Sequence, residues 1–222
     1  MYQAVILDVD GTLVDSNDAH ARAWVDAFAE SGRRVPFERV RPHIGMGSDK
    51  LLPAAIGIDL ESEEGRALAA RRREIFQRRY LDAVKPTRGA SELLNWFRDE
   101  RLKLVVASSA EEEELRDLLR IAGATRLVEG AASRDEAPQS KPDPDIVRAA
   151  LARTGCPPQE VMMLGDTPYD VEASLRSGIG IVALRCGGWN DDALRGAVAI
   201  YDDPEDLLDH YPLSPFKRPL PV

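Results

Sequence analysis

Two aspartates separated by one residue follow a short apolar run near the start of the chain. Asp8 and Asp10 come directly after residues 4–7, in the sequence Asp8-Val9-Asp10-Gly11-Thr12. Carboxylates this close repel each other unless a divalent cation or a proton lies between them and a substrate. Gly11 would let the backbone turn sharply after the pair. The motif alone could be a surface turn, but it favours cation-assisted chemistry.

Three more polar positions lie at the ends of expected elements. Ser108 follows the run 104–107, Lys141 stands ahead of an expected helix, and Asp166 and Asp170 follow the apolar run 161–164. A hydroxyl or an ammonium can bind phosphoryl oxygens, and a second acidic pair can share a cation. Each position alone also has an ordinary reading, as a strand-ending serine, a surface lysine or a helix cap.

The expected elements alternate between strand and helix after residue 89. Apolar runs predict strands at 4–7, 103–107, 161–164, 179–184 and 198–201, and helical periodicity fills 90–100, 111–121, 144–153, 169–177 and 205–210. This alternation predicts an α/β fold with a doubly wound parallel sheet. Ligands bind outside the carboxyl ends of such strands, so we expect the four polar sites to converge there.

The stretch between the first two strands is helical in pattern. Residues 16–85 contain no strand signal, although the strands at 4–7 and 103–107 belong to one sheet. We therefore expect a core of residues 1–15 and 86–222 and an inserted helical domain of residues 16–85. Residues 211–222 are rich in proline and are expected to form an irregular surface segment.

Composition excludes several classes of protein. The net charge of −9 disfavours nucleic acid and anionic membranes as partners. No apolar run approaches the roughly 20 residues that span a bilayer, and we expect no secretory leader. Cys156 and Cys186 have no metal-type spacing and are expected to be buried or half-buried free thiols in a reducing, cytoplasmic setting.

As a set, the motifs resemble those of the haloacid dehalogenase (HAD) superfamily. Asp8 with Asp10, then Ser108, then Lys141, then Asp166 with Asp170 match its four motifs in order. The resemblance covers residues 4 to about 185. It implies a Rossmann-like core, and the inserted helices look like the cap domain of the beta-phosphoglucomutase and phosphoglycolate phosphatase branch.

The resemblance also implies a mechanism. Asp8 would attack phosphorus and form an aspartyl-phosphate, and Asp10 would act first as acid and then as base. Mg²⁺ would be held by Asp8, the backbone carbonyl of Asp10, and Asp166, with Asp170 as a further metal candidate that could instead orient Lys141 or a metal-bound water. Ser108 and Lys141 would hold phosphoryl oxygens. The second aspartate favours phosphoryl transfer over dehalogenation, since a departing halide needs no proton.

Further candidates for substrate contact lie beside the motifs and in the insertion. They are Gly11, Thr12 and Ser109 in the core, and His20, Trp24, Gly45, Gly47 and Lys50 in the helical domain. Trp24 can equally be a core aromatic residue. A set of arginines is more typical of a solvated helix face: Arg71, Arg72, Arg73, Arg78 and Arg79.

The leading hypothesis is a Mg²⁺-dependent phosphatase acting on a small phosphorylated metabolite, such as a sugar phosphate or phosphoglycolate, as a monomer or weak homodimer. A sugar-phosphate mutase is the first alternative, since His20 and Trp24 resemble mutase positions. Against it, Ser48 stands where a mutase arginine aligns, and Thr12-Leu13-Val14 and Asp170 are phosphatase-like. A non-catalytic binding protein of the same fold is the second alternative, which the intact motif set disfavours.

Overall fold

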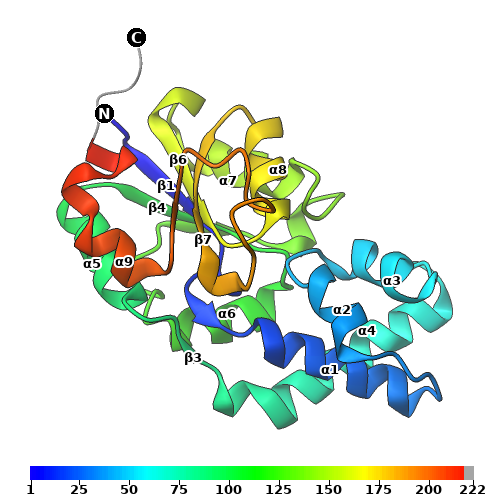
Figure 1. Cartoon of the computed structure of the whole chain (residues 1–222). Helices are drawn as coiled ribbons and strands as arrows, with labels where there is room; N and C mark the ends of the chain where they lie inside the picture. Colours follow the sequence, from blue (N-terminus) through cyan, green and yellow to red (C-terminus); the bar gives the residue numbers. More distant parts are fainter. Residues whose placement is uncertain (218–222) are drawn as a thin grey trace. The chain divides into compact units, whose positions relative to one another are not determined.

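A six-stranded, entirely parallel sheet forms the centre of the larger unit in the computed structural model, which describes residues 1–217 (Figure 1). The strand order is β5-β4-β1-β6-β7-β8, and the order reverses beside β1. The predicted α/β parallel sheet is therefore confirmed. The strands are β1 (Ala4–Leu7), β4 (Lys103–Ala107), β5 (Gly130–Ala132), β6 (Val161–Gly165), β7 (Gly180–Leu184) and β8 (Ala199–Tyr201).

The register of the central strands aligns their carboxyl ends. Leu7 of β1 pairs with Val106 of β4 on one side and with Leu164 of β6 on the other. The residues that follow the three strands, Asp8, Ser108 and Asp166, therefore emerge at one edge of the sheet.

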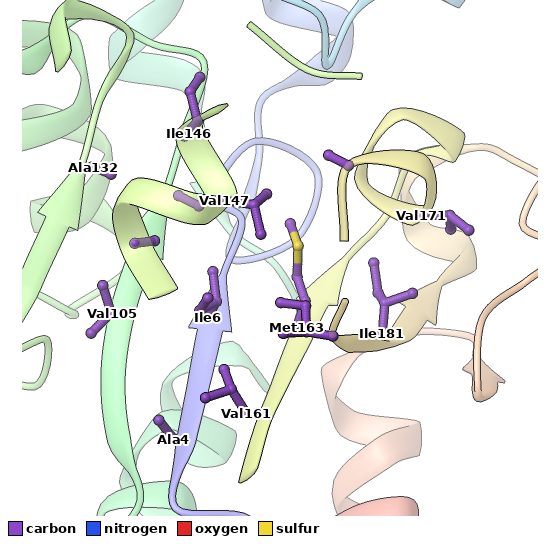
Figure 2. Close-up of a cluster of buried hydrophobic side chains, with 14 of the residues drawn as sticks. Ala4, Ile6, Val105, Ala132, Ile146, Val147, Val161, Met163, Val171 and Ile181 are labelled. Atoms are coloured by element: carbon purple, nitrogen blue, oxygen red, sulfur yellow. The ribbon is translucent and has the colours of Figure 1, made fainter. Parts of the chain in front are cut away.

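One face of the sheet is covered by α7 (Asp145–Thr154) and α8 (Pro168–Arg176). Alternate strand residues such as Ile6 and Met163 join Ile146 and Val147 of α7 in a buried cluster, which Figure 2 shows. Full burial of each such side chain contributes about 1.5–3 kcal/mol. The packing fixes both helices, and hence the loops before them, against the strands.

The other face carries the intervening residues of the same strands. Val5, Leu7 and Leu164 are fully buried there, as expected for a parallel sheet covered on both sides. The helices α5 (Ala90–Asp99) and α9 (Pro204–Asp209) contact each other and strands β4 and β8 respectively. A further α-helix of this unit is α6 (Glu112–Ile121).

A second compact unit spans Ser16–Val84 and is helical. Its helices are α1 (Asn17–Glu30), α2 (Phe37–Val40), α3 (Ser48–Ile56) and α4 (Glu63–Ile75), and a π-helical segment, Phe76–Tyr80, follows α4. The unit has its own core, which includes Trp24, Phe28, Leu51, Leu52 and Leu68. The two chain segments that flank the unit, β2 (Val14–Asp15) and β3 (Lys85–Pro86), pair antiparallel.

One strand within the described residues differs from the sequence expectation. Strand β5, Gly130-Ala131-Ala132, was not predicted, because it lacks the β-branched and aromatic residues that mark strands. Within the helical unit, the hydrogen bonding changes from α-helical to π-helical at Phe76.

The expectation of an irregular surface tail is wrong for residues 211–217. Tyr211–Leu213 and Pro215–Lys217 form 3-10 turns, and Tyr211 and Phe216 are buried. The Phe216 ring centroid lies 4.9 Å from that of Phe97 on α5. The aromatic residues outweigh the prolines here, because they bury a large apolar area. Residues 218–222 lie outside the described part of the chain.

No helix within residues 1–217 combines the length and the apolar character needed to cross a membrane.

Phe216→Ala is expected to lower the free energy of unfolding by about 3 kcal/mol, because it removes a buried ring from the Phe97 contact. Leu213→Ala is the matched control in the same segment. Leu213 is 71% exposed, so its truncation is expected to change stability by no more than about 0.5 kcal/mol. Urea denaturation followed by circular dichroism measures both, and equal losses would contradict the packed tail.

Candidate active site

A tight backbone turn follows β1 and presents the first two aspartates. Gly11 has φ 79°, and its N–H donates to the carbonyl of Val14 at 2.7 Å. The N–H groups of Leu13 and Val14 both donate to the carbonyl of Val9. The turn buries Asp8, which is 7% exposed, and leaves Asp10 only partly buried. Only glycine adopts the positive φ at this position without strain.

Lys141 lies at the centre of the acidic cluster. Its ammonium group is 2.5 Å from Asp8 Oδ1 and 2.8 Å from Asp170 Oδ1, and it donates to the carbonyl of Ala107 at 2.7 Å. The lysine side chain is 1% exposed. Asp8 and the carbonyl of Ala107 accept hydrogen bonds from this ammonium group, and Asp170 forms an ion pair with it. Lys141 therefore neutralises part of the charge that Asp8 and Asp170 bring into the interior.

Asp170 is oriented by the start of α8. Thr167 caps the helix: its hydroxyl accepts from the N–H of Asp170 at 3.2 Å and donates to Asp170 Oδ2 at 2.7 Å. The N–H of Thr167 also donates to Oδ2, at 3.1 Å. This reciprocal capping box fixes the carboxylate and turns its other oxygen toward Lys141.

Asp166 is completely buried and is bound to the β1 turn. Thr12 Oγ1 donates to Asp166 Oδ1 at 2.7 Å and lies 3.4 Å from Asp8 Oδ2. The N–H of Thr12 donates to the carbonyl of Val9, and that of Gly11 is used in the same turn. Gly11 and Thr12 were expected to contact substrate. In the structure both stabilise the turn, and Thr12 also binds Asp166.

The acidic side chains fit a divalent cation. Asp8, Asp166 and Asp170 each offer a carboxylate oxygen, and these oxygens lie within 4.8 Å of one another. Three carboxylates beside one ammonium leave an excess of negative charge in a buried place, which a hard cation with oxygen ligands would compensate. The Asp10 side chain is not in this group, and the sequence expectation for it concerned its backbone carbonyl.

Burial changes the proton affinities of the cluster. Burial raises the pKa of Asp8 well above its ordinary value, and Asp170, Asp166 and Asp10 add to this against the opposing effect of Lys141. For Lys141, burial alone would lower the pKa, but the attraction of Asp170 and Asp8 outweighs it and the pKa is raised. The lysine therefore stays charged, and its surroundings favour the protonated form of Asp8 when no cation is bound.

Ser108 lies at the end of β4, beside the unpredicted strand. Its N–H donates to the carbonyl of Ala132 in β5, and its hydroxyl accepts from the N–H of Ala110 at 3.1 Å. The side chain is 1% exposed, whereas Ser109 is half-buried. Strand β5 thus fixes the backbone that carries the serine.

Two glycines that sequence reasoning missed press against the aspartates. A Cβ atom on Gly165 would lie 2.7 Å from Asp170 Cβ, and one on Gly187 would lie 1.9 Å from Asp166 Oδ2. No side chain fits either place unless the aspartate moves. The sequence allowed helix capping by either Asp166 or Thr167, and the structure shows Thr167 as the cap, in a capping box with Asp170.

The candidates in the helical unit have different surroundings. Trp24 is 2% exposed in the core of that unit, and His20 stacks on Phe76 with ring centroids 4.0 Å apart. Gly45, with φ 104°, and Gly47 precede α3, and Lys50 is half-buried in its first turn.

The arginines of α4 and the following segment are only partly a solvated face. Arg78 is exposed, but Arg72 lies 2.9 Å from His20 Nδ1 and over the ring of Trp24. Arg71 and Arg79 both pair with Glu30 of α1.

The sequence matches one family model and a set of curated relatives. The family model described as haloacid dehalogenase-like hydrolase matches residues 2–178. A phosphoglycolate phosphatase from Pseudomonas syringae pv. syringae is 31% identical over 188 residues, which cover 82% of this chain and 69% of the relative.

Solved structures match over nearly the whole chain. A hydrolase from Pseudomonas syringae superposes with a TM-score of 0.88 at 29% identity, covering 94% of this chain and 97% of that one. A beta-phosphoglucomutase from Clostridium difficile shares the fold with a TM-score of 0.83 at 19% identity, covering 95% of each chain.

Lys141→Met is expected to destabilise the protein by about 3–5 kcal/mol, because it leaves buried carboxylates without their cation. Asp8→Asn is the matched comparison and is expected to stay within about 1 kcal/mol of the parent, since burial already disfavours the charge that it removes. Chemical denaturation at neutral pH in the absence of metal measures both free energies. Equal losses in the two variants would contradict this account of the charge balance.

Proposed function

Since the chain belongs to the haloacid dehalogenase-like hydrolase family, we propose that it is a Mg²⁺-dependent phosphatase that hydrolyses a small phosphomonoester through an aspartyl-phosphate at Asp8. The observation that carries the proposal is the convergence of Asp8, Lys141 and Asp166 in one buried cluster. The similarity to a phosphoglycolate phosphatase over most of the chain supports the choice of phosphatase.

The acidic cluster supplies the ligands for the metal. Asp8, Asp166 and the backbone carbonyl of Asp10 would hold Mg²⁺, which would neutralise charge on the phosphoryl oxygens when bound. Asp170 is engaged by Thr167 and Lys141, so we assign it chiefly to positioning the lysine. Because its carboxylate also lies within 4.8 Å of those of Asp8 and Asp166, Asp170 could instead bind a water on the metal.

Asp8 and Asp10 divide the reaction into two steps. A carboxylate oxygen of Asp8 forms a bond to phosphorus while the bond to the leaving oxygen breaks, and Asp10 gives that oxygen a proton. Asp10 then takes a proton from water, whose oxygen attacks phosphorus and releases inorganic phosphate from Asp8. The division matters because unaided hydrolysis of phosphate monoesters is slow enough to need accelerations of up to ~10²¹.

The phosphoryl group needs neutralising and oriented donors. Ser108 and Ser109 follow β4 at the same edge of the sheet as Asp8, and Lys141 places its charge directly beside the Asp8 carboxylate. Fixed donors of this kind stabilise charge as it develops, at no cost of reorientation during the reaction.

The helical unit is the proposed source of substrate choice. Gly45, Gly47 and Lys50 offer backbone amides and a cation ahead of and within the first turn of α3, where anionic groups are favoured. His20 and Lys50 would contact the part of the substrate that does not react, whereas Trp24 belongs to the core of the helical unit. Sugar phosphates and phosphoglycolate are the substrate classes to examine first.

Asp8→Asn is expected to lower phosphatase activity by at least about 10³-fold, and Asp10→Asn by about 10²–10⁴-fold, while both proteins stay folded. A panel of p-nitrophenyl phosphate, phosphoglycolate and sugar phosphates, assayed with Mg²⁺ and with EDTA, measures this. Activity that survives Asp8→Asn or EDTA would overturn the proposal. Conversion of a sugar phosphate that requires a bisphosphate primer would indicate a mutase, and no turnover of any ester would indicate a binding protein.

Mg²⁺ binding is expected to release protons at any pH at which Asp8 of the metal-free protein is partly protonated. The pKa of Asp8 is raised, so part of the metal-free protein carries a proton that the cation must displace. Affinity for Mg²⁺ should therefore rise with pH through this raised pKa and level off above it. Calorimetric titrations in two buffers of different ionisation enthalpy count the protons released. Mg²⁺ binding that releases no proton at any pH at which the protein is folded would contradict the expectation.

A further inference from the structure

A short turn after β7 lies against the acidic cluster. Arg185–Gly187 forms a 3-10 turn that directly continues the strand. The thiol of Cys186 lies 3.1 Å from the carbonyl of Gly11, in the turn after β1. The Arg185–Gly187 turn is thereby attached to the loop that carries Asp8 and Asp10.

Gly187 limits where the Asp166 carboxylate can lie. A Cβ atom at this position would stand 1.9 Å from Asp166 Oδ2 and 2.7 Å from Asp166 Cβ and Cγ. These separations are far below van der Waals contact, so the backbone of Gly187 forms one wall of the carboxylate site. The hydroxyl of Thr12 holds the other oxygen, Oδ1, at 2.7 Å. Between them the two residues leave the carboxylate little freedom to rotate.

Arg185 fixes the outer side of the same turn. Its guanidinium binds both oxygens of Asp191, at 2.6 and 3.0 Å, and Asp202 at 2.7 Å. Bidentate bonds to a carboxylate are geometrically specific, and the third bond reaches the residue just after β8. Arg185 thus joins the turn to two neighbouring segments, although it lies outside the acidic cluster.

We propose that the Arg185–Gly187 turn positions Asp166 for metal binding, with Gly187 acting through its lack of a side chain and Arg185 through its hold on the turn. The inference rests on the proposed function, because it takes Asp166 to be a ligand of Mg²⁺. Metal ligation tolerates distance errors of about 0.2 Å, and loss of an outer partner typically costs about 10–100-fold in affinity. Gly187→Ala would place a Cβ atom 1.9 Å from Asp166 Oδ2, so the carboxylate of Asp166 would have to move by more than that tolerance.

The test is equilibrium Mg²⁺ binding to the intact chain by calorimetry, with the melting temperature of the metal-free protein as a second readout. Gly187→Ala is expected to weaken Mg²⁺ binding by about 10–100-fold. Arg185→Gln is expected to weaken it by a smaller factor, about 3–10-fold, and Arg185→Lys, which keeps the charge but not the bidentate geometry, should not restore it fully.

Gly130→Ala is the matched control. Gly130 belongs to the same sheet, and a Cβ atom there would lie 3.4 Å from Arg153 Cδ, which is an ordinary contact. The Mg²⁺ affinity of the Gly130→Ala protein should therefore equal that of the parent. Folded Gly187→Ala protein with parental affinity would overturn the inference while leaving the proposed function intact. Absence of Mg²⁺ binding by the parent chain would instead overturn the proposed function. If Gly187→Ala does not fold, Arg185→Gln decides, and parental affinity in that variant overturns the inference.

Discussion

The buried charge balance around Lys141 is the constraint on which the site depends. One ammonium group lies between Asp8 and Asp170, with Asp166 close enough to share a cation with both. Removing these groups from water is costly, and the mutual attraction offsets that cost only when every oxygen and proton is well placed. The sheet register, the β1 turn and the capped start of α8 all serve this placement.

Several contacts serve folding and chemistry together. Asp170 completes the capping box of α8 and also binds Lys141, so formation of that helix orients part of the site. Thr12 belongs to the β1 turn and binds Asp166, which lies 154 residues further along the chain. A chain that has assembled its parallel sheet has therefore already brought its acidic groups together, and a cation can bind to a site formed in advance.

Strongly patterned elements were predictable and contacts between distant glycines and side chains were not. The runs before Asp8 and Asp166 are apolar throughout, which marks buried parallel strands, and the carboxyl ends of such strands indicate where a site lies. Strand β5 could not be predicted, because glycine and alanine do not favour strands. It forms through its hydrogen bonds with the neighbouring strand β4. Gly187 has no local signature either, since its importance depends on Asp166, which is close in space and remote in sequence. The roles of the helical-unit residues stay predictions.

The antiparallel pairing of β2 with β3 has a consequence for how such chains diversify. Val14 pairs with Pro86 and Asp15 with Lys85, so the segment between them leaves and rejoins the core at neighbouring points. Closing a longer loop between two fixed points costs little extra entropy, about 0.6 kcal/mol for each doubling of its length. Evolution can therefore exchange or enlarge the intervening module without altering the strands that carry the aspartates, and a protein engineer can graft a foreign module at the same junction.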